Sequence, residues 1–214
     1  MAGPEVVARP VVSGIVLAAG SSTRMGRPKQ LLEVGERSLL QVVLDEALRA
    51  PIDEIVVVLG HRADEIRAGL RLPAGRRVRV VVNPEHACGQ SSSLRVGLRA
   101  ASARADAAAI LLGDQPGVQA EVVGAVVAAF HTTRAAVVRP VWTVGAERVP
   151  GHPVLLARRI WEDVARLEGD QGARALIVAH PEWVVEVPCE GAPPRDVDTW
   201  ADYLAMIDGP KAEG

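Results

Sequence analysis

Aromatic residues are scarce in this chain, and their scarcity argues against one class of function. Phe, Trp and Tyr together make up 3% of the 214 residues. Proteins that bind single-stranded nucleic acid without sequence preference stack the bases on aromatic side chains, so such a platform is not expected here. The formal net charge is -2 and arginine is spread throughout, so we predict no basic face and no nucleic-acid partner.

Cysteine and long apolar segments are also scarce. The two cysteines, Cys88 and Cys189, are isolated and lack metal-type spacing, which predicts free thiols in a reducing cytoplasm. No stretch approaches the roughly 18 consecutive apolar residues of a transmembrane helix, and residues 1–10 contain no apolar segment of signal-peptide type. The sequence therefore predicts a cytoplasmic protein with no membrane partner.

Small aliphatic residues, in contrast, are abundant, and apolar residues make up 49% of the chain. Branched apolar runs typical of buried strands alternate with segments of helical periodicity. Strands are expected at 15–17, 55–59, 78–82, 107–112, 135–139 and 183–187, a hairpin at 142–149, and helices at 38–50, 62–70, 94–101 and 122–130. This alternation predicts one α/β domain with a mostly parallel sheet between helices.

The most informative stretch is L-A-A-G-S-S-T-R-M-G-R-P-K-Q-L-L, at 17–32. It follows the first expected strand with small residues, and Gly20 lets the backbone approach a ligand closely. Arg24 and Lys29 place two cations in the same loop, and three hydroxyl side chains add hydrogen-bond donors. Such a loop at the carboxyl end of a strand suits a polyphosphate. A merely solvated loop is the alternative, which two cations, two glycines and a proline disfavour.

Two better-known phosphate-binding loops do not match this stretch. A Walker loop needs Lys and Ser or Thr directly after its last glycine, whereas Gly26 is followed by Arg27 and Pro28. The dinucleotide fingerprint G-x-G-x-x-G needs glycine where this chain has Ser22.

An acidic residue follows another expected strand. Asp114 lies directly after 107–112, at the edge of a parallel sheet where ligands bind. A carboxylate there can hold Mg²⁺, which prefers oxygen ligands and bridges protein carboxylates to phosphates. The alternative is that Asp114 caps the helix expected to begin near Val118.

With these residues in place, the 17–32 loop resembles the entry loop of the MobA-like NTP transferases, the family of molybdenum cofactor cytidylyltransferase and its guanylyl relatives. Every fixed position of the family pattern L-A-(A/G)-G-x-S-x-R-M-G-x-x-K-x-L-L is present. In this family A-A-G accompanies cytidine nucleotides and A-G-G guanosine nucleotides, so Ala19 implies CTP. The segments 89–98 (G-Q-S-S-S-L-R-V-G-L) and 113–116 (G-D-Q-P) resemble the family's nucleoside-binding and metal-binding segments. Capping of the following helix is the alternative role for the serines.

Three segments of the second half resemble the same family. The turn containing His152 resembles a G-x-P turn that lines the acceptor pocket, although a lone histidine there is equally an ordinary loop residue. The run G-D-Q-G-A-R at 169–174 implies that Arg174 contacts the acceptor phosphate, with a surface salt bridge as the alternative. The run D-V-D-T-W-A-D-Y at 196–203 resembles the family ending D-(I/V)-D-T-P-E-D-Y, with Trp200 and Ala201 in place of Pro and Glu. It implies that Asp198 completes the metal site, with Asp196 as second choice. Helix capping by Asp198 or Thr199 is the alternative.

The resemblance covers 12–207 and implies a three-layer α/β/α sandwich of the Rossmann-like nucleotidyltransferase type, with terminal tails at 1–11 and 208–214, the last six residues disordered. The implied nucleotide-binding residues are Leu17, Ala18, Ala19, Gly20, Ser22, Arg24, Lys29, Gly89, Gln90 and Ser93. Catalysis is expected from Arg24, Lys29 and Asp114, the metal ligands are Asp114 and Asp198, and acceptor contacts come from His152 and Arg174. The cofactor implied is Mg²⁺, or Mn²⁺ in its place.

The resemblance implies transfer of CMP from CTP to the terminal phosphate of molybdopterin or molybdenum cofactor, with release of pyrophosphate. A chaperone that matures molybdoenzymes is an expected partner. Another phosphorylated acceptor is one alternative. Pterin- or dye-linked oxidoreduction is another, disfavoured by the absent dinucleotide fingerprint. A non-catalytic cofactor carrier is disfavoured because Arg24, Lys29, Asp114 and Asp198 are all present.

Overall fold

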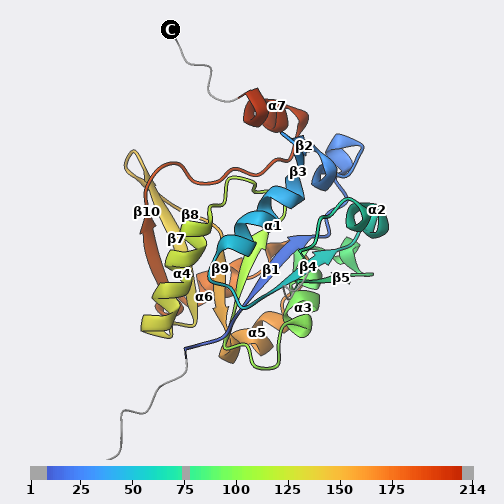
Figure 1. The fold of residues 1–214 in the computed structure, drawn as a ribbon. Coiled ribbons are helices and arrows are strands. Elements are labelled where there is room, and N and C mark those ends of the chain that lie inside the picture. Colours follow the sequence, from blue (N-terminus) through green and yellow to red (C-terminus); the bar gives the residue numbers. More distant parts are fainter. Residues whose placement is uncertain (1–8, 74–77, 209–214) are drawn as a thin grey trace, which may run out of the picture.

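Eight strands form a central sheet with helices on both faces (Figure 1). The computed structural model describes residues 9–73 and 78–208. The strands are β1 (Val12–Ala18), β2 (Glu33–Val34), β3 (Arg37–Ser38), β4 (Glu54–Leu59), β5 (Val78–Val82), β6 (Ala107–Leu112), β7 (Val137–Val144), β8 (Glu147–Pro150), β9 (Val154–Ala157) and β10 (Val184–Cys189). The α-helices are α1 (Leu39–Arg49), α2 (Ala63–Ala68), α3 (Gln90–Ala100), α4 (Ala120–Thr133), α5 (Trp161–Ala165), α6 (Arg174–Ala179) and α7 (Trp200–Asp208).

The sheet runs in the order β10-β7-β9-β6-β1-β4-β5, with β8 paired to β7. Strand β1 lies near its centre, parallel to both β4 and β6. The mostly parallel α/β fold predicted from the sequence is confirmed, and so is the hairpin, which β7 and β8 form. Strand β9, antiparallel to both β6 and β7, was not predicted. Its four apolar residues are too few for periodicity to distinguish a strand from a loop.

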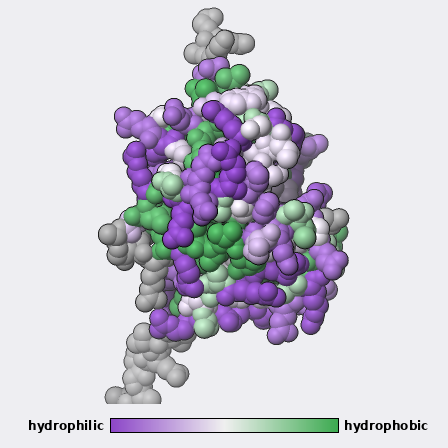
Figure 2. Space-filling view, turned by 90° about the vertical axis from the view of Figure 1, so that its right-hand side faces the viewer, coloured by the Kyte–Doolittle hydropathy of each residue, from purple (hydrophilic) through white to green (hydrophobic). Residues whose placement is uncertain are grey.

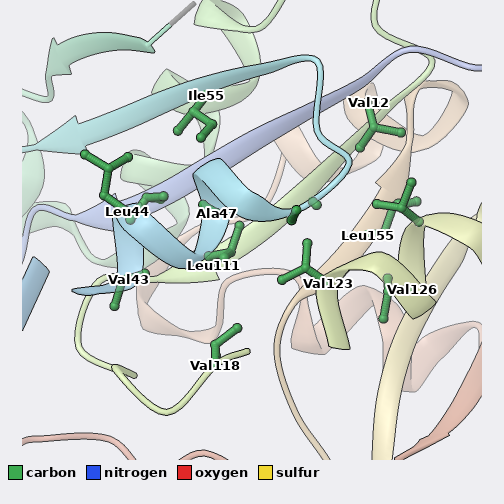
Figure 3. Packing of buried hydrophobic residues seen from close by; sticks show 14 of the residues in the cluster. Val12, Val43, Leu44, Ala47, Ile55, Leu111, Val118, Val123, Val126 and Leu155 are labelled. Carbon is green, nitrogen blue, oxygen red and sulfur yellow. The ribbon is translucent and has the colours of Figure 1, made fainter. Parts of the chain in front are cut away.

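Side chains of β1 alternate between two hydrophobic clusters, because successive residues of a strand point to opposite faces. Val12 and Val16 pack into the cluster under α1 and α4, part of which is shown in Figure 3. Ile15 and Leu17 pack into the other, under α3, α5 and α6. Gly97 lets α3 approach the strand, since a Cβ atom at this position would lie 2.5 Å from Ile15 Cγ2. Burial on both faces explains the continuous apolar runs of the central strands.

A local hydrogen bond explains where helix α1 begins. Helix α1 begins where Ser38 Oγ accepts a hydrogen bond from the Gln41 backbone N–H at 3.3 Å, as the sequence predicted.

Cys88 and Cys189 are both free thiols. The tail 209–214, expected to be disordered, lies outside the described residues.

The molecular surface is largely hydrophilic on the face shown in Figure 2, where hydrophobic side chains gather mainly near the centre. Within residues 9–73 and 78–208, no helix combines the length and the apolar character needed to cross a bilayer.

Candidate active site

Loops after β1, β5 and β6, together with the segments that carry Asp170 and Asp198, surround a cleft of about 580 Å³, here called the nucleotide cleft. Most residues that the sequence assigned to the nucleotide line it: Leu17, Ala19, Gly20, Arg24, Lys29, Gly89, Gln90 and Ser93. Asp114 and Asp198 line it too, although they are distant in the sequence. Ala18 and Ser22 are not among its lining residues.

The loop after β1 is held together by its own polar side chains. Gln30 is 2% exposed, and its Nε2 donates to the carbonyl oxygens of Ala18 at 3.0 Å and Gly20 at 3.2 Å. Ser22 adopts a left-handed backbone conformation with φ of 53°, and its Oγ accepts from the Lys29 backbone N–H at 3.1 Å. The Ser22 hydroxyl therefore braces the loop. Sequence reasoning missed Gln30, because the family pattern leaves its position unspecified.

The charged side chains meet at one point. Lys29 Nζ donates to Asp114 Oδ2 and to Asp198 Oδ1, both at 2.7 Å. An Nη atom of Arg24 lies 3.1 Å from Asp198 Oδ2. The two expected cations and the two expected metal ligands thus form one cluster, assembled from the ends of β1 and β6 and from the segment before α7.

The pKa values of this cluster follow from its contacts. Burial alone would lower the pKa of Lys29, but the charges and hydrogen bonds of Asp114 and Asp198 outweigh it and raise that pKa. The hydrogen bond from Lys29 and the nearby Arg24 lower the pKa of Asp198. Lys29 is therefore an ammonium and Asp198 a carboxylate at neutral pH.

The donor set fits a divalent cation. Asp114 and Asp198 direct carboxylate oxygens at the Lys29 ammonium, so a metal ion that took the place of this ammonium would meet two hard oxygen ligands. In the described parts of the chain, no group of three or more His, Cys, Asp and Glu side chains is placed to hold a metal. Bound Mg²⁺ would therefore need phosphate oxygens and waters for its remaining positions, which is usual for this ion.

Asp196 lies near this cluster but has a different hydrogen-bond partner. It accepts a hydrogen bond from Gln115 Nε2 at 2.7 Å, and burial raises its pKa. Asp198 does not cap helix α7 with its side chain. Thr199 and Asp202 do so instead, because each accepts a hydrogen bond from the backbone N–H of the other in a reciprocal capping box. The carboxylate of Asp198 is thereby left to face the cleft.

Helix α7 also braces the loop after β1. Trp200 stands where the family pattern has proline, and its ring lies 4.8 Å from the guanidinium carbon of Arg27. The hydroxyl of Tyr203 donates to the Glu33 carbonyl oxygen at 2.7 Å. Tryptophan in place of proline at position 200 therefore adds a contact to the loop at 17–32.

On the far side of the cleft, the buried side-chain amide of Asn83 bonds to the first turn of helix α3. Asn83 is 1% exposed, and its Nδ2 donates to Ser92 Oγ at 2.8 Å and Ser93 Oγ at 3.0 Å. Its Oδ1 accepts from the Glu85 backbone N–H at 2.9 Å. Neither serine caps α3 through its side chain. Asn83 was given no role in the site from the sequence, because its serine partners lie nine and ten residues further on.

A larger cleft of about 1030 Å³, here called the acceptor cleft, adjoins the first and shares Leu17, Gln90, Leu112 and Asp170 with it. His152 and Arg174 both line it. His152 Nδ1 lies 3.2 Å from the Ile110 carbonyl oxygen, and burial lowers the pKa of the imidazole, which is neutral near pH 7. Arg174 is exposed and makes no ion pair with another described residue, so the salt-bridge alternative is not observed.

The two clefts are separated by interlocking loops. Gly89 has φ of 94°, and a Cβ atom at this position would lie 2.5 Å from the carbonyl carbon of Gly169. Asp170 Oδ1 accepts from the Gln90 backbone N–H at 3.3 Å. The segment before α3 and the one before α6 therefore form a common wall.

A Rossmann-like α/β sheet with a glycine-containing loop, paired cations and converging carboxylates at its carboxyl edge is the arrangement expected of a nucleotidyltransferase. The model of the MobA-like NTP transferase domain matches residues 14–183, and the chain belongs to that family. The chain is 32% identical over 204 residues to nicotine blue oxidoreductase of Paenarthrobacter nicotinovorans, covering 92% of this chain and 97% of that protein. The bifunctional protein GlmU of Sorangium cellulosum is 38% identical over 110 residues, covering 49% of this chain and 23% of that protein.

Solved structures share this fold. The crystal structure of Rv0371c from Mycobacterium tuberculosis superposes with a TM-score of 0.82 at 33% identity, covering 95% of this chain and 100% of that one. Rv0371c has also been solved in complex with manganese, and that structure has a TM-score of 0.78 to this chain at 32% identity, covering 94% of this chain and 100% of that one.

Proposed function

We propose that this nucleotidyltransferase transfers CMP from CTP to the terminal phosphate of a phosphorylated pterin, the molybdopterin or molybdenum cofactor class, and releases pyrophosphate. The observation that carries the proposal is the cluster of Lys29, Asp114 and Asp198 in a nucleotide cleft that adjoins a second cleft and shares four lining residues with it. Ala19, at the entrance of the loop, supports CTP as the donor.

The reaction is an in-line displacement at phosphorus. An oxygen of the acceptor phosphate attacks the α-phosphorus of CTP, the bond to the β-phosphate oxygen breaks, and pyrophosphate leaves with the electron pair. The acceptor phosphate is already ionised, so no side chain has to remove a proton. Catalysis is then a matter of positioning and of neutralising charge.

Each charged residue has a role in this scheme. Arg24 and Lys29 contact the triphosphate and stabilise the charge that grows on pyrophosphate. Asp114 and Asp198 would hold Mg²⁺ or Mn²⁺, and the bound metal would neutralise charge on the phosphate oxygens. The manganese complex of Rv0371c supports this use of a divalent metal.

The acceptor cleft suits a ring system that carries a phosphate. Its walls include aliphatic side chains of Leu94, Ile110 and Ile177, which suit a flat heterocycle. Arg174 is free to grip a phosphate with its planar fork, and the neutral His152 offers a polar contact. The product is delivered in the cytoplasm to a chaperone that matures molybdoenzymes.

Nicotine blue oxidoreductase, matched along almost its entire length, favours a second candidate function, the reduction of a heterocyclic dye. This function needs a hydride or electron donor. The chain lacks the dinucleotide fingerprint at its first loop, where Ser22 replaces the second glycine. The charged cluster has no role in such a reaction, so we place the transferase first.

A nucleotide panel tests the two functions together. Pyrophosphate release is measured with CTP, GTP, ATP and UTP, with and without molybdenum cofactor, and a parallel arm follows NAD(P)H oxidation with a heterocyclic dye. We expect pyrophosphate only with CTP plus the cofactor. If pyrophosphate is released from another nucleotide in the presence of molybdenum cofactor, that nucleotide is the donor instead of CTP. NAD(P)H oxidation without pyrophosphate release would overturn the proposal.

A further inference from the structure

We propose that His86 provides the ring surface against which the nucleobase stacks in the nucleotide cleft. This inference rests on the proposed function, because it takes the ligand to be a nucleoside triphosphate. Among the described residues that line this cleft, His86 alone has a ring side chain. The other lining residues offer small, aliphatic, amide or charged groups, none of which presents a flat π-face to a base.

The place of His86 along the sheet edge fits this role. The strands β6, β1, β4 and β5 are successive neighbours, and His86 follows β5. Asp114 follows β6, and Arg24 and Lys29 follow β1, so the charged groups lie at the opposite end of the cleft. From β6 to β5 there are three strand spacings, roughly 14 Å. The cleft thus has charges at one end and a ring at the other, as a nucleoside triphosphate requires.

The His86 side chain is packed against the ends of two central strands. Gly60 follows β4, and a Cβ atom there would lie 2.5 Å from His86 Cβ and 2.7 Å from the Ala19 carbonyl oxygen. The ring of His61 approaches that of His86 edge-on, with 6.0 Å between their centroids. The absence of a side chain at Gly60 therefore lets the imidazole stand beside Ala19, the residue that implied CTP.

The main chain before His86 is held from both sides. The Glu85 backbone N–H donates to Asn83 Oδ1 at 2.9 Å, and the Glu85 carbonyl oxygen accepts from Ser92 Oγ at 3.0 Å. Because this backbone is already ordered, stacking on His86 costs little conformational entropy. Histidine is one of the side chains on which unpaired bases stack in nucleic-acid complexes.

Calorimetric titration with CTP and with inorganic tripolyphosphate, which has the phosphates but no base, tests this role. In His86→Ala we expect CTP to bind about tenfold more weakly. Tripolyphosphate should bind as it does to the wild-type protein, and His86→Phe should keep the wild-type affinity for CTP. His61→Ala is the matched control, because His61 touches His86 but does not line the cleft, and it should leave both affinities within about twofold of the wild type.

Three results would overturn the inference. Unchanged CTP affinity in His86→Ala removes the stacking role. An equal loss for CTP and tripolyphosphate shows a general disturbance of the cleft. A His86→Phe protein as weak as His86→Ala shows a polar contact instead of stacking. The proposed function fails separately: its donor is wrong if the wild-type protein binds no CTP, and the same comparison then applies to whichever nucleoside triphosphate it does bind.

Discussion

The nucleotide cleft and the acceptor cleft differ in how their functional side chains are held. In the first, Gln30 and Asn83 are buried, Lys29 has 12% of its side chain exposed, and all three are bonded to other protein groups. In the second, Arg174 is exposed, and Val178, at the same cleft, is 71% exposed. We therefore expect Lys29 to be positioned before the nucleotide binds, and Arg174 to become ordered only when the acceptor binds. Substitutions on the two sides should consequently fail in different ways.

The largest effect is expected from Asp114→Asn, which keeps the side-chain shape and removes its charge. Turnover should fall about 10²-fold or more while the melting temperature stays near that of the wild type. Steady-state pyrophosphate release at limiting Mg²⁺ measures it. Asp196→Asn is the control, since Asp196 bonds to Gln115 and not to Lys29. Near-normal turnover in Asp114→Asn would remove this residue from the metal site.

Lys29→Ala should come next and should separate rate from binding. Because Lys29 meets charge that grows on the leaving pyrophosphate, kcat should fall by about 10²-fold and CTP affinity by less than tenfold. Rapid-quench kinetics together with calorimetric CTP binding give both quantities. A variant that loses affinity and keeps kcat would place Lys29 in ground-state binding alone.

Gln30→Ala tests whether the nucleotide side is built in advance. It leaves the Ala18 and Gly20 carbonyl oxygens without their amide donor, so the free energy of unfolding should fall by about 1–3 kcal/mol and CTP should bind more weakly. Gln41→Ala is the matched control, because Gln41 is also buried and bonds to the Arg71 backbone away from the cleft. Urea unfolding and CTP titration are measured for both variants. Gln41→Ala should lower the free energy of unfolding and leave the CTP affinity unchanged, whereas Gln30→Ala should lower both.

Arg174→Ala should show the opposite pattern. We expect unchanged stability and CTP affinity, and an acceptor KM raised about tenfold, since a hydrogen bond to a charged group typically contributes about 1.5–3 kcal/mol. Arg174→Lys should recover only part of the affinity, because lysine lacks the planar fork. Arg166→Ala, which removes an exposed arginine paired with Asp163, is the control. A defect confined to CTP would move Arg174 out of the acceptor pocket.

The smallest effect is expected from Ala19→Gly. Removing one methyl from the base side of the cleft should narrow the preference for CTP over GTP by only a few-fold, since a methylene-sized change is worth about 1 kcal/mol. Competition binding with the two nucleotides measures the ratio. An equal preference already present in the wild-type protein would contradict the CTP assignment.

How much of the site could be predicted from the sequence depends on how far apart its residues lie along the chain. The loop at 17–32 and the strands before Asp114 could be located because a motif or a buried run is local, and the parallel sheet then brings their ends together. The bridge from Lys29 to Asp114 and Asp198 spans 85 and 169 residues, so no local pattern reveals it. Gln30 and Asn83 were missed for a related reason: a buried amide is defined by the partners it meets, which only the fold supplies.

The wall between the clefts puts the two binding sites in direct contact. Gly89 and Gln90 on one side contact Gly169 and Asp170 on the other, so a shift of either loop on binding is transmitted directly to its neighbour. Whatever factor CTP applies to the affinity for the acceptor, the acceptor must apply to the affinity for CTP, because the four binding steps form a closed cycle. The order in which the ligands arrive can change the route but not the stability of the ternary complex.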